Sequence, residues 1–266
     1  MRQLVVTVSE DEVELVSDAL WGLGVVAIEE RSSDDGTVEL WTSLGDEAGE
    51  SDVSLPQPWP FRFVEVDEAV ADTWRQFAAP VWVAPDFVVC PAWIPFEPSA
   101  GVTVLRIEPG ATFGMGDHPT TILSLRAVRR LVQPGCTVLD VGCGSGVLAI
   151  GACVVGAGSA VGIDIAPAAV PVGRANAVAN GVASRVEIST TDLADIEGDF
   201  DLVVANILAP TLVAMAADLQ RVLAPGGALV ISGILTSAHD HVLNALAPLK
   251  VVTSDEMDGW SAVTLR

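Results

Sequence analysis

The sequence predicts an α/β protein in which a mostly parallel, doubly wound sheet follows a small α+β domain. In the second half of the chain, apolar strand-like runs alternate with helical segments, as in parallel sheets that helices cover on both faces. The first part instead places one helix among several strands. A chain of 266 residues has room for two modest domains. We expect a first domain at 1–66, a linker helix at 67–80 and a second domain at 81–266.

The first domain begins with a strand and a helix. The run QLVVTVS is rich in β-branched residues, and the segment after it carries apolar residues at helical spacing (Val13, Val16, Leu20) before two glycines end it. Two further strands flank the turn SSDDG. This β-α-β-β order predicts a sandwich of the ferredoxin-like kind, either truncated or completed by a later helix. The expected elements are a strand at 3–9, a helix at 9–24, strands at 25–30 and 36–44, an acidic loop at 45–60 and a strand at 61–68.

The second domain alternates strands and helices. Its strands are continuous apolar runs such as FDLVVAN, which are typical of strands buried on both faces. We expect strands at 81–93, 102–110, 137–142, 160–166, 185–192, 200–208 and 228–234, and helices at 120–132, 146–157, 167–181 and 211–227.

The formal net charge of −22 is concentrated near the start of the chain. Residues 1–68 hold 17 of the 35 acidic side chains and only three basic ones. Such a surface repels phosphate backbones, so we expect no direct nucleic-acid binding. It would instead steer a basic protein partner through long-range attraction. A general acidic bias that serves solubility would leave the same pattern, and both interpretations stay open.

Cysteines, histidines and hydropathy set further bounds. The four cysteines show no C-x-x-C pairing, which indicates reduced thiols in a cytoplasmic protein. No apolar run is long enough to span a membrane, and the N-terminus shows no secretory signal. His239 and His241 form an H-x-H pair without a nearby third ligand, so we expect no metal site.

The segment LDVGCGSGVLAI predicts a site for a nucleoside cofactor. It places Asp140 at a strand end, and Gly142 and Gly144 in the turn before a helix, where a ligand can lie against bare backbone. A dinucleotide fingerprint would require glycine in place of Val147, so the spacing is G-x-G-x-G. The next strand ends at Asp164, whose carboxylate can accept both hydroxyls of a ribose.

This arrangement resembles the class I S-adenosylmethionine-dependent methyltransferases, whose catalytic domain is Rossmann-like. By that resemblance the loop at 140–146 holds the methionine end of the cofactor, and Asp164 holds its ribose. Asp192, in the segment TTDLAD, is a candidate for a contact near the adenine. A short polar residue after a strand is also a common turn former, so this second interpretation stays open.

Asn206 ends the run FDLVVAN, where the substrate pocket of such an enzyme opens. Its amide can orient either the cofactor or a nucleophilic nitrogen, which makes it a candidate catalytic residue. Enzymes that methylate planar nitrogens usually carry an aromatic residue just after this position, whereas Ile207, Leu208 and Ala209 follow here. The apolar replacement suits an aliphatic amine better than a flipped base.

A second glycine cluster, EPGATFGMGDHPTT, precedes the helix before the first strand of the sheet, which places it at the rim of the same pocket. Its glycines allow a loop to fold over a bound cofactor. His118 in this loop is a candidate for a role at the substrate or for a hydrogen bond that fixes the loop, and Phe113 is a candidate cofactor contact. Together with LDVGCGSGVLAI, GIDIAP and VVANILA, this cluster closely resembles the ribosomal protein L11 methyltransferase (PrmA) family over roughly 67–266.

The resemblance implies which residues contact S-adenosylmethionine. In that family these are the second threonine of H-P-T-T, the first loop glycine, the acid that ends the second strand and the asparagine of N-I-L. They correspond here to Thr121, Gly142, Asp164 and Asn206. One departure is Met115, where the family usually has threonine.

The resemblance also implies an activity. It is N-methylation of lysine side chains and of an N-terminal amine on ribosomal protein L11 of the large subunit, a basic partner that the acidic first domain would recognise. Alternatives within the same fold are a lysine methyltransferase that acts on another protein, such as an electron-transfer flavoprotein, or on a small amine. An alternative of another class is a non-enzymatic assembly factor that binds S-adenosylmethionine.

Overall fold

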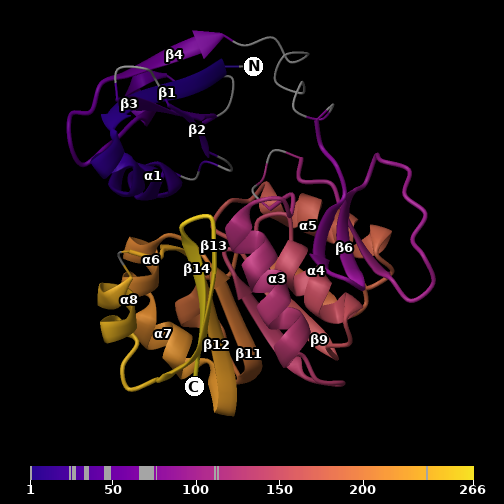
Figure 1. Ribbon diagram of the computed structural model, residues 1–266. Helices are drawn as coiled ribbons and strands as arrows, with labels where there is room; N and C mark the ends of the chain where they lie inside the picture. The colour runs from indigo at the N-terminus through magenta and orange to yellow at the C-terminus, as the bar shows by residue number, and fades with distance from the viewer. Residues whose placement is uncertain are drawn as a thin grey trace. The chain divides into compact units, whose positions relative to one another are not determined.

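The structure of the protein is a computed structural model, and the chain divides into two compact units, Met1–Ala78 and Ala79–Arg266 (Figure 1). Each unit is described by itself. The residues that the structure describes are 2–23, 25, 28–32, 36–44, 49–65, 75, 77–110, 112, 114–237 and 239–266. Most of the predicted linker helix at 67–80 lies outside them.

The first unit is a four-stranded antiparallel sheet with one helix on its face. The sheet has the order β2-β3-β1-β4, and Leu4, Val6 and Val8 of its central strand pack against Val16 and Leu20 of the helix. Between β3 and β4, the described residues form only a short 3-10 turn, so the ferredoxin-like order is confirmed in a truncated form. The elements are β1 (Arg2–Ser9), η1 (Glu10–Glu12), α1 (Val13–Trp21), β2 (Ile28–Ser32), β3 (Thr37–Thr42), η2 (Glu50–Asp52) and β4 (Phe61–Glu65).

The second unit opens with a small sheet that packs on a layer of helices. Strands β5 (Val81–Ala84), β6 (Phe87–Pro91) and β7 (Thr103–Ile107) form it in that order. Its apolar side chains share one core with α3 (Pro119–Leu131) and α4 (Val147–Val154). The loop between β7 and α3, residues 108–118, therefore starts on this sheet and ends at a helix that covers the main one.

The main sheet has seven strands in the order β10-β9-β8-β11-β12-β14-β13. All pairs from β10 to β12 are parallel, and β14 is antiparallel to both of its neighbours. The strands that follow β8 lie toward one edge of the sheet, and those that follow β11 lie toward the other edge. In open α/β sheets a crevice forms where the strand order reverses in this way, beyond the carboxyl ends of the strands. The strands are β8 (Thr137–Val141), β9 (Ser159–Ile163), β10 (Val186–Ser189), β11 (Phe200–Asn206), β12 (Leu223–Leu235), β13 (Val251–Met257) and β14 (Trp260–Leu265).

Helices cover both faces of this sheet, which confirms the predicted doubly wound α/β fold (Figure 1). On one face lie α3, α4 and α5 (Ala169–Ala179), and on the other α6 (Ala209–Ala214), α7 (Ala216–Arg221) and α8 (Asp240–Ala245). Alternate residues of each central strand enter the two cores. On β8, for example, Val138 belongs to the first core and Leu139 to the second.

Two predicted elements are wrong in their extent. The strand expected at 81–93 is in fact the antiparallel pair β5 and β6, because the chain turns at residues 85–86. We expected a single helix at 211–227, but the structure has two short helices there, and β12 already begins at Leu223. The residue Leu223 pairs with Phe200 on β11, and Pro225 cannot continue a helix. Strand pairing with a distant part of the chain therefore overrides the helical spacing of the apolar residues.

Candidate active site

The loop after β8, Gly142–Gly146, which we call the glycine loop, lies at the carboxyl edge of the sheet. The backbone N–H groups of Gly142 and Cys143 donate hydrogen bonds to the Ile163 carbonyl at the end of β9, at 2.9 and 3.0 Å. Gly142 has a φ of +72°, a conformation that residues with a side chain seldom adopt. The turn is therefore fastened to the next strand while the backbone at Gly142 stays exposed.

A side chain at Gly142 would have no room. A Cβ atom there would overlap Cγ2 of Ile207, the residue that follows β11. Gly142 is therefore required both by its φ and by the close approach of the β11 end. The bare backbone that the sequence predicted as a cofactor surface also allows two adjacent strand ends to pack together.

Asp164, directly after β9, is bonded to the glycine loop. Its Oδ2 accepts a hydrogen bond from the Gly144 N–H at 2.8 Å, and its Oδ1 accepts one from the Ala166 N–H at 2.9 Å. A carboxylate offers about four acceptor positions, so each oxygen can still accept another donor. The side chain is half-buried, and the sequence predicted it as the acceptor for the two hydroxyls of a ribose.

Asp140 lies beneath the glycine loop and is fully buried. Its Oδ2 accepts a hydrogen bond from the Ala149 N–H at 2.9 Å. Because α4 is capped by Gly146, which has no side chain, Asp140 supplies from the strand the acceptor that an N-cap residue usually gives. Burial, with a smaller contribution from the charge of Asp164, raises the pKa of the Asp140 carboxyl to about 7.

The 108–118 loop is tied to the glycine loop. Ser145 is fully buried and donates a hydrogen bond from its Oγ to the Gly114 carbonyl at 2.6 Å. A Cβ atom at Gly114, whose φ is +100°, would lie 2.9 Å from the same Oγ. The two glycine clusters of the sequence therefore touch, as we expected from their positions before and after the first helix of the sheet.

His118 ends this loop and caps α3. Its Nδ1 lies 2.8 Å from the Thr120 hydroxyl and accepts a hydrogen bond from the Thr120 N–H at 3.3 Å. Its ring packs edge-on against Trp260 at the start of β14, with 5.2 Å between the ring centroids. Burial lowers the pKa of His118, against a smaller opposing effect of Asp117. The imidazole is therefore neutral near pH 7 and fixes the loop.

Thr121 lies in the first turn of α3 and is fully buried. Its hydroxyl has no hydrogen-bond partner within the part of the chain that the structure describes. The carbonyl of Thr120, the preceding residue, accepts a long hydrogen bond of 3.4 Å from Ser232, which pairs with Asn206 across β11 and β12. The start of α3 therefore lies beside the ends of the strands that carry the site.

Asn206 is the last residue of β11 and is half-buried. Among the described residues, none of the hydrogen bonds engages its side-chain amide. The backbone of Ile207 donates to the Ser232 carbonyl at 3.2 Å, which holds the strand end in place. The Asn206 amide is thus positioned by its strand and available to another molecule.

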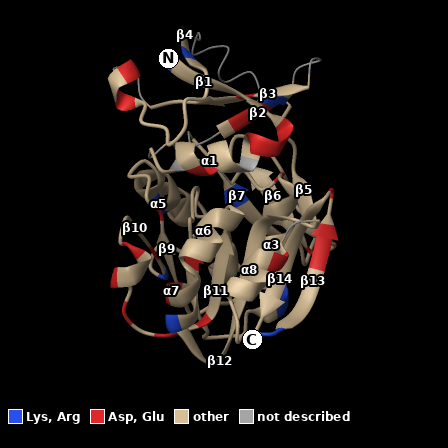
Figure 2. Ribbon diagram, turned by 90° about the vertical axis from the view of Figure 1, so that its left-hand side faces the viewer, with Lys and Arg blue, Asp and Glu red and all other residues tan. Residues whose placement is uncertain are grey.

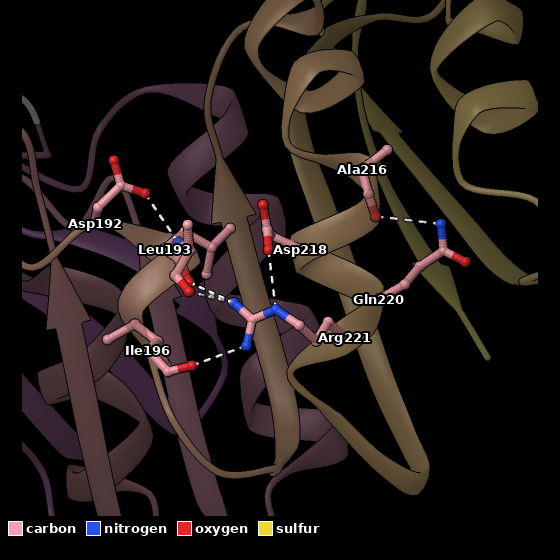
Figure 3. A network of polar contacts seen from close by, with 8 residues as sticks. Asp192, Leu193, Ile196, Ala216, Asp218, Gln220 and Arg221 are labelled. Atoms are coloured by element: carbon pink, nitrogen blue, oxygen red, sulfur yellow. Dashed lines mark hydrogen bonds and ion pairs between the residues drawn. The ribbon is translucent and has the colours of Figure 1, made fainter.

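Asp192 has a local structural role. Its Oδ1 accepts a hydrogen bond from the Ala194 N–H at 2.9 Å and begins the short turn η4 (Leu193–Asp195). Arg221 of α7 holds the same turn by donating to the Leu193 and Ile196 carbonyls at 2.7 and 2.9 Å (Figure 3). Asp192 is exposed, and its contact near an adenine remains a prediction. Phe113 lies outside the described residues.

Sequence reasoning missed two residues of this edge and the structural role of a third. Asp140 was predicted at a strand end and, by the resemblance, in the cofactor loop, but its buried bond to Ala149 comes from the tertiary fold. The indole of Trp260 reaches His118 from the far end of the chain. Asn176 of α5 joins the two glycine clusters through backbone groups. Buried polar residues within apolar segments were the signal that could have pointed to Asp140 and Asn176.

The edge offers what S-adenosylmethionine needs. It has bare backbone at Gly142, a carboxylate with unused acceptor positions at Asp164, and at Thr121 a buried hydroxyl that no described residue bonds. Within the described residues, the buried Oδ1 of Asp140 likewise has no hydrogen-bond partner. Hydroxyls, an amino group and a carboxylate of the cofactor are chemically suited to such groups.

Two open cavities lie away from this edge. One, of about 880 Å³, is lined by β5 and the exposed face of α3, and another, of about 690 Å³, by α5, β9 and β10. Neither contains a predicted site residue. Because the chemically suited groups converge at the glycine loop, we place the site there. In the described part of the chain, no cluster of three or more histidine, cysteine or acidic side chains could hold a metal ion.

Comparisons with known proteins identify the family of the chain. The family model "Ribosomal protein L11 methyltransferase (PrmA)" matches residues 46–266. The chain belongs to that family. A relative from Geobacter metallireducens, named ribosomal protein L11 methyltransferase, is 49% identical over 74% of this chain and 66% of its own length. One of the same name from Symbiobacterium thermophilum is 41% identical over 85% of this chain and 74% of its own length.

A solved structure extends the similarity to the fold. The crystal structure of ribosomal protein L11 methylase from Lactobacillus delbrueckii subsp. bulgaricus matches with a TM-score of 0.66 and 30% identity. The match covers 71% of this chain and 98% of that one. Family and fold therefore support S-adenosylmethionine as the cofactor. None of the helices in the described ranges has the length and apolar character that crossing a membrane requires.

Proposed function

We propose that this PrmA family member methylates amine nitrogens of ribosomal protein L11, which are lysine side chains and the N-terminal amine. The observation that carries the proposal is the bond between Asp164 and Gly144, at the ends of two adjacent parallel strands. It joins a carboxylate suited to a ribose to a loop suited to the methionine end of the cofactor. The relatives that match 74% and 85% of this chain are named ribosomal protein L11 methyltransferase.

S-adenosylmethionine supplies, when bound, a methyl group on a positively charged sulfur. The residues that would hold it are Asp164, as an acceptor for the ribose, Gly142 and Gly144, through their bare backbone, and Thr121, through its buried hydroxyl. Positioning of two reactants can supply much of the acceleration in a transfer of this kind. The fixed backbone of the glycine loop and of the β11 end provides that positioning.

The substrate amine must lose a proton before it can react. A lysine amine has a pKa of about 10.4, so its neutral form at pH 7 costs about 5 kcal/mol. Burial against apolar groups lowers that cost, since it disfavours the charged form. Ile207 and Trp260 supply apolar surface, and the oxygen of the Asn206 amide can orient the amine. His118, neutral because burial lowers its pKa, adds no positive charge that would repel the cofactor.

The acidic first unit is suited to binding a basic protein. Figure 2 shows acidic residues on η1 and β2 of this unit, which include Glu10, Asp11, Glu12, Glu29 and Glu30. Their field attracts a basic partner and disfavours nucleic acid. We therefore propose 1–66 as the substrate-recognition domain and 81–266 as the methyltransferase domain. The proposal includes a cytoplasmic location, where ribosomal proteins are made.

Intact-protein mass spectrometry of ribosomal protein L11 tests this function. The substrate is incubated with S-adenosylmethionine and either the wild type, Asp164→Ala or, as a matched control, Asp195→Ala, which removes an exposed acid of η4. We expect mass increases of whole methylene units with the wild type and the control, and a strong loss with Asp164→Ala. No mass increase with a wild type that binds the cofactor would reject L11 as the substrate.

A further inference from the structure

Asn176 on α5 is a buried amide that bridges the two loops of the site. Its exposed fraction is 2%. Its Nδ2 donates to the Glu108 carbonyl and to the Ser145 carbonyl, each at 2.9 Å, and its Oδ1 accepts from the Glu108 N–H at 2.9 Å. Glu108 begins the 108–118 loop, and Ser145 belongs to the glycine loop. One side chain therefore bonds to the backbone of both.

The chemistry of these bonds specifies asparagine. Both N–H groups of the amide are used as donors, and the oxygen is used as an acceptor. An aspartate at this position has no N–H and would face two carbonyl oxygens with a charged oxygen. An alanine would remove all three hydrogen bonds, including the one to the buried Ser145 carbonyl, and the loss of a partner is costly for a buried group.

Close packing at the same junction places both loops against α5. A Cβ atom at Gly110 would lie 3.2 Å from Val172 of α5, and one at Gly146 would lie 3.4 Å from the Cα of Gly173. Val172, Gly173 and Asn176 thus present one part of α5 to both loops. The Ser145–Gly114 bond is a second, direct tie between them.

We propose that Asn176 is a positioning residue that couples the 108–118 loop to the glycine loop, so that the two loops hold the cofactor as one unit. The inference rests on the assignment of S-adenosylmethionine to the glycine loop. Asn176 is bonded to backbone alone and need not touch the cofactor. Its removal breaks one of the two ties between the loops, which weakens cofactor binding more than it slows transfer in the saturated enzyme.

Asn180, one turn further along α5, provides a matched control. Its Oδ1 accepts from the Arg106 N–H at 2.8 Å, and its Nδ2 donates to the Arg106 carbonyl at 2.7 Å and to the Asn176 carbonyl at 2.8 Å. It therefore bonds to the same stretch of chain with the same number of hydrogen bonds, but not to the glycine loop. A general loss of stability would affect both variants, whereas loop coupling concerns Asn176 alone.

The test measures the Kd of S-adenosylmethionine by calorimetry, and kcat and KM with L11, for the wild type, Asn176→Ala and Asn180→Ala. Thermal unfolding of each variant reports its fold. We expect Asn176→Ala to raise Kd and the cofactor KM about tenfold while kcat falls far less, and Asn180→Ala to leave Kd within about twofold. Equal Kd values for the two variants would overturn the inference and leave the proposed function standing.

Ser145→Ala keeps the inference testable if Asn176→Ala does not fold. It removes the other tie while α5 stays intact, so we expect it to raise Kd as well. In a double variant, the two effects should be less than additive, because both residues serve one coupling. A Ser145→Ala protein with wild-type affinity would overturn the inference. A wild type that does not bind S-adenosylmethionine would reject both the inference and the proposed function.

Discussion

Gly142→Ala tests the claim that the glycine loop is built from two separate constraints. The first constraint is its φ of +72°, and the second is the space that Ile207 occupies. Alanine can satisfy neither. The substitution adds one methyl group, so its effect comes from the backbone conformation and from crowding rather than from a lost contact.

The two constraints have separable magnitudes. Holding an L-residue in the left-handed region costs about 1–2 kcal/mol. Forcing a methyl group into Ile207 adds about 1–3 kcal/mol, the usual cost of overpacking. We therefore expect Gly142→Ala to lower the free energy of unfolding by about 2–5 kcal/mol.

Gly181→Ala is the matched control. Gly181, in the turn after α5, has a φ of +69°, and nothing lies within 4 Å of a Cβ atom built on it. Gly181→Ala should therefore lower the free energy of unfolding only by the conformational cost, about 1–2 kcal/mol. Urea unfolding of the two variants with unchanged m-values gives the difference directly. Adding Ile207→Ala to Gly142→Ala should recover part of the loss, because Ile207 is half-buried and its own removal costs little.

Equal losses for Gly142→Ala and Gly181→Ala would refute the crowding part of the reasoning. A double variant with no recovery would do the same. In either case the approach of the β11 end to the glycine loop would not be the reason for glycine at 142.

Three further predictions concern the acidic and amide groups of the site. Asp164→Ala should raise the Kd for S-adenosylmethionine at least tenfold, since it removes acceptors for the ribose; an unchanged Kd in a titration would exclude the ribose contact. Asn206→Ala should lower kcat about tenfold or more, and near-normal turnover in a transfer assay would remove it from the site. Because burial raises the pKa of Asp140 to about 7, its contribution to stability is present at low pH and is lost as the pH rises from about 4 to about 7. The free energy of unfolding of the wild type relative to Asp140→Asn should therefore fall across that window, and a flat difference would contradict the raised pKa.

The sequence predicted the parts of the site that follow one another along the chain. The strand, the glycine turn and the helix after it are local, and Asp164 follows from the end of the next strand. The apolar residues of these segments recur with the spacing of helices and strands. The strand pairing confirms the predicted parallel sheet. For His118, the sequence left open a role at the substrate and a hydrogen bond that fixes the loop. Its hydrogen bond with Thr120 fits the second role.

What the sequence could not supply are contacts between distant segments. Asn176 bonds to Glu108, which lies 68 positions away in the sequence. Its partners are backbone groups, which every residue has, so the residue types at those positions do not reveal the contact. The early start of β12 has the same cause, because it depends on pairing with β11. Trp260 lies at the start of the last strand, and its approach to His118 likewise depends on the fold. Such contacts need the topology before they can be inferred.

The measurement that tests the central claim most directly is the position of a labelled methyl group. Ribosomal protein L11 is incubated with this protein and S-adenosylmethionine that carries a deuterated methyl group, digested, and mapped by tandem mass spectrometry. We predict label on lysine side-chain nitrogens or on the N-terminal amine of L11, and its loss with Asp164→Ala. Label on other side chains, or none on L11 while the cofactor binds, would contradict amine methylation of L11 at this site.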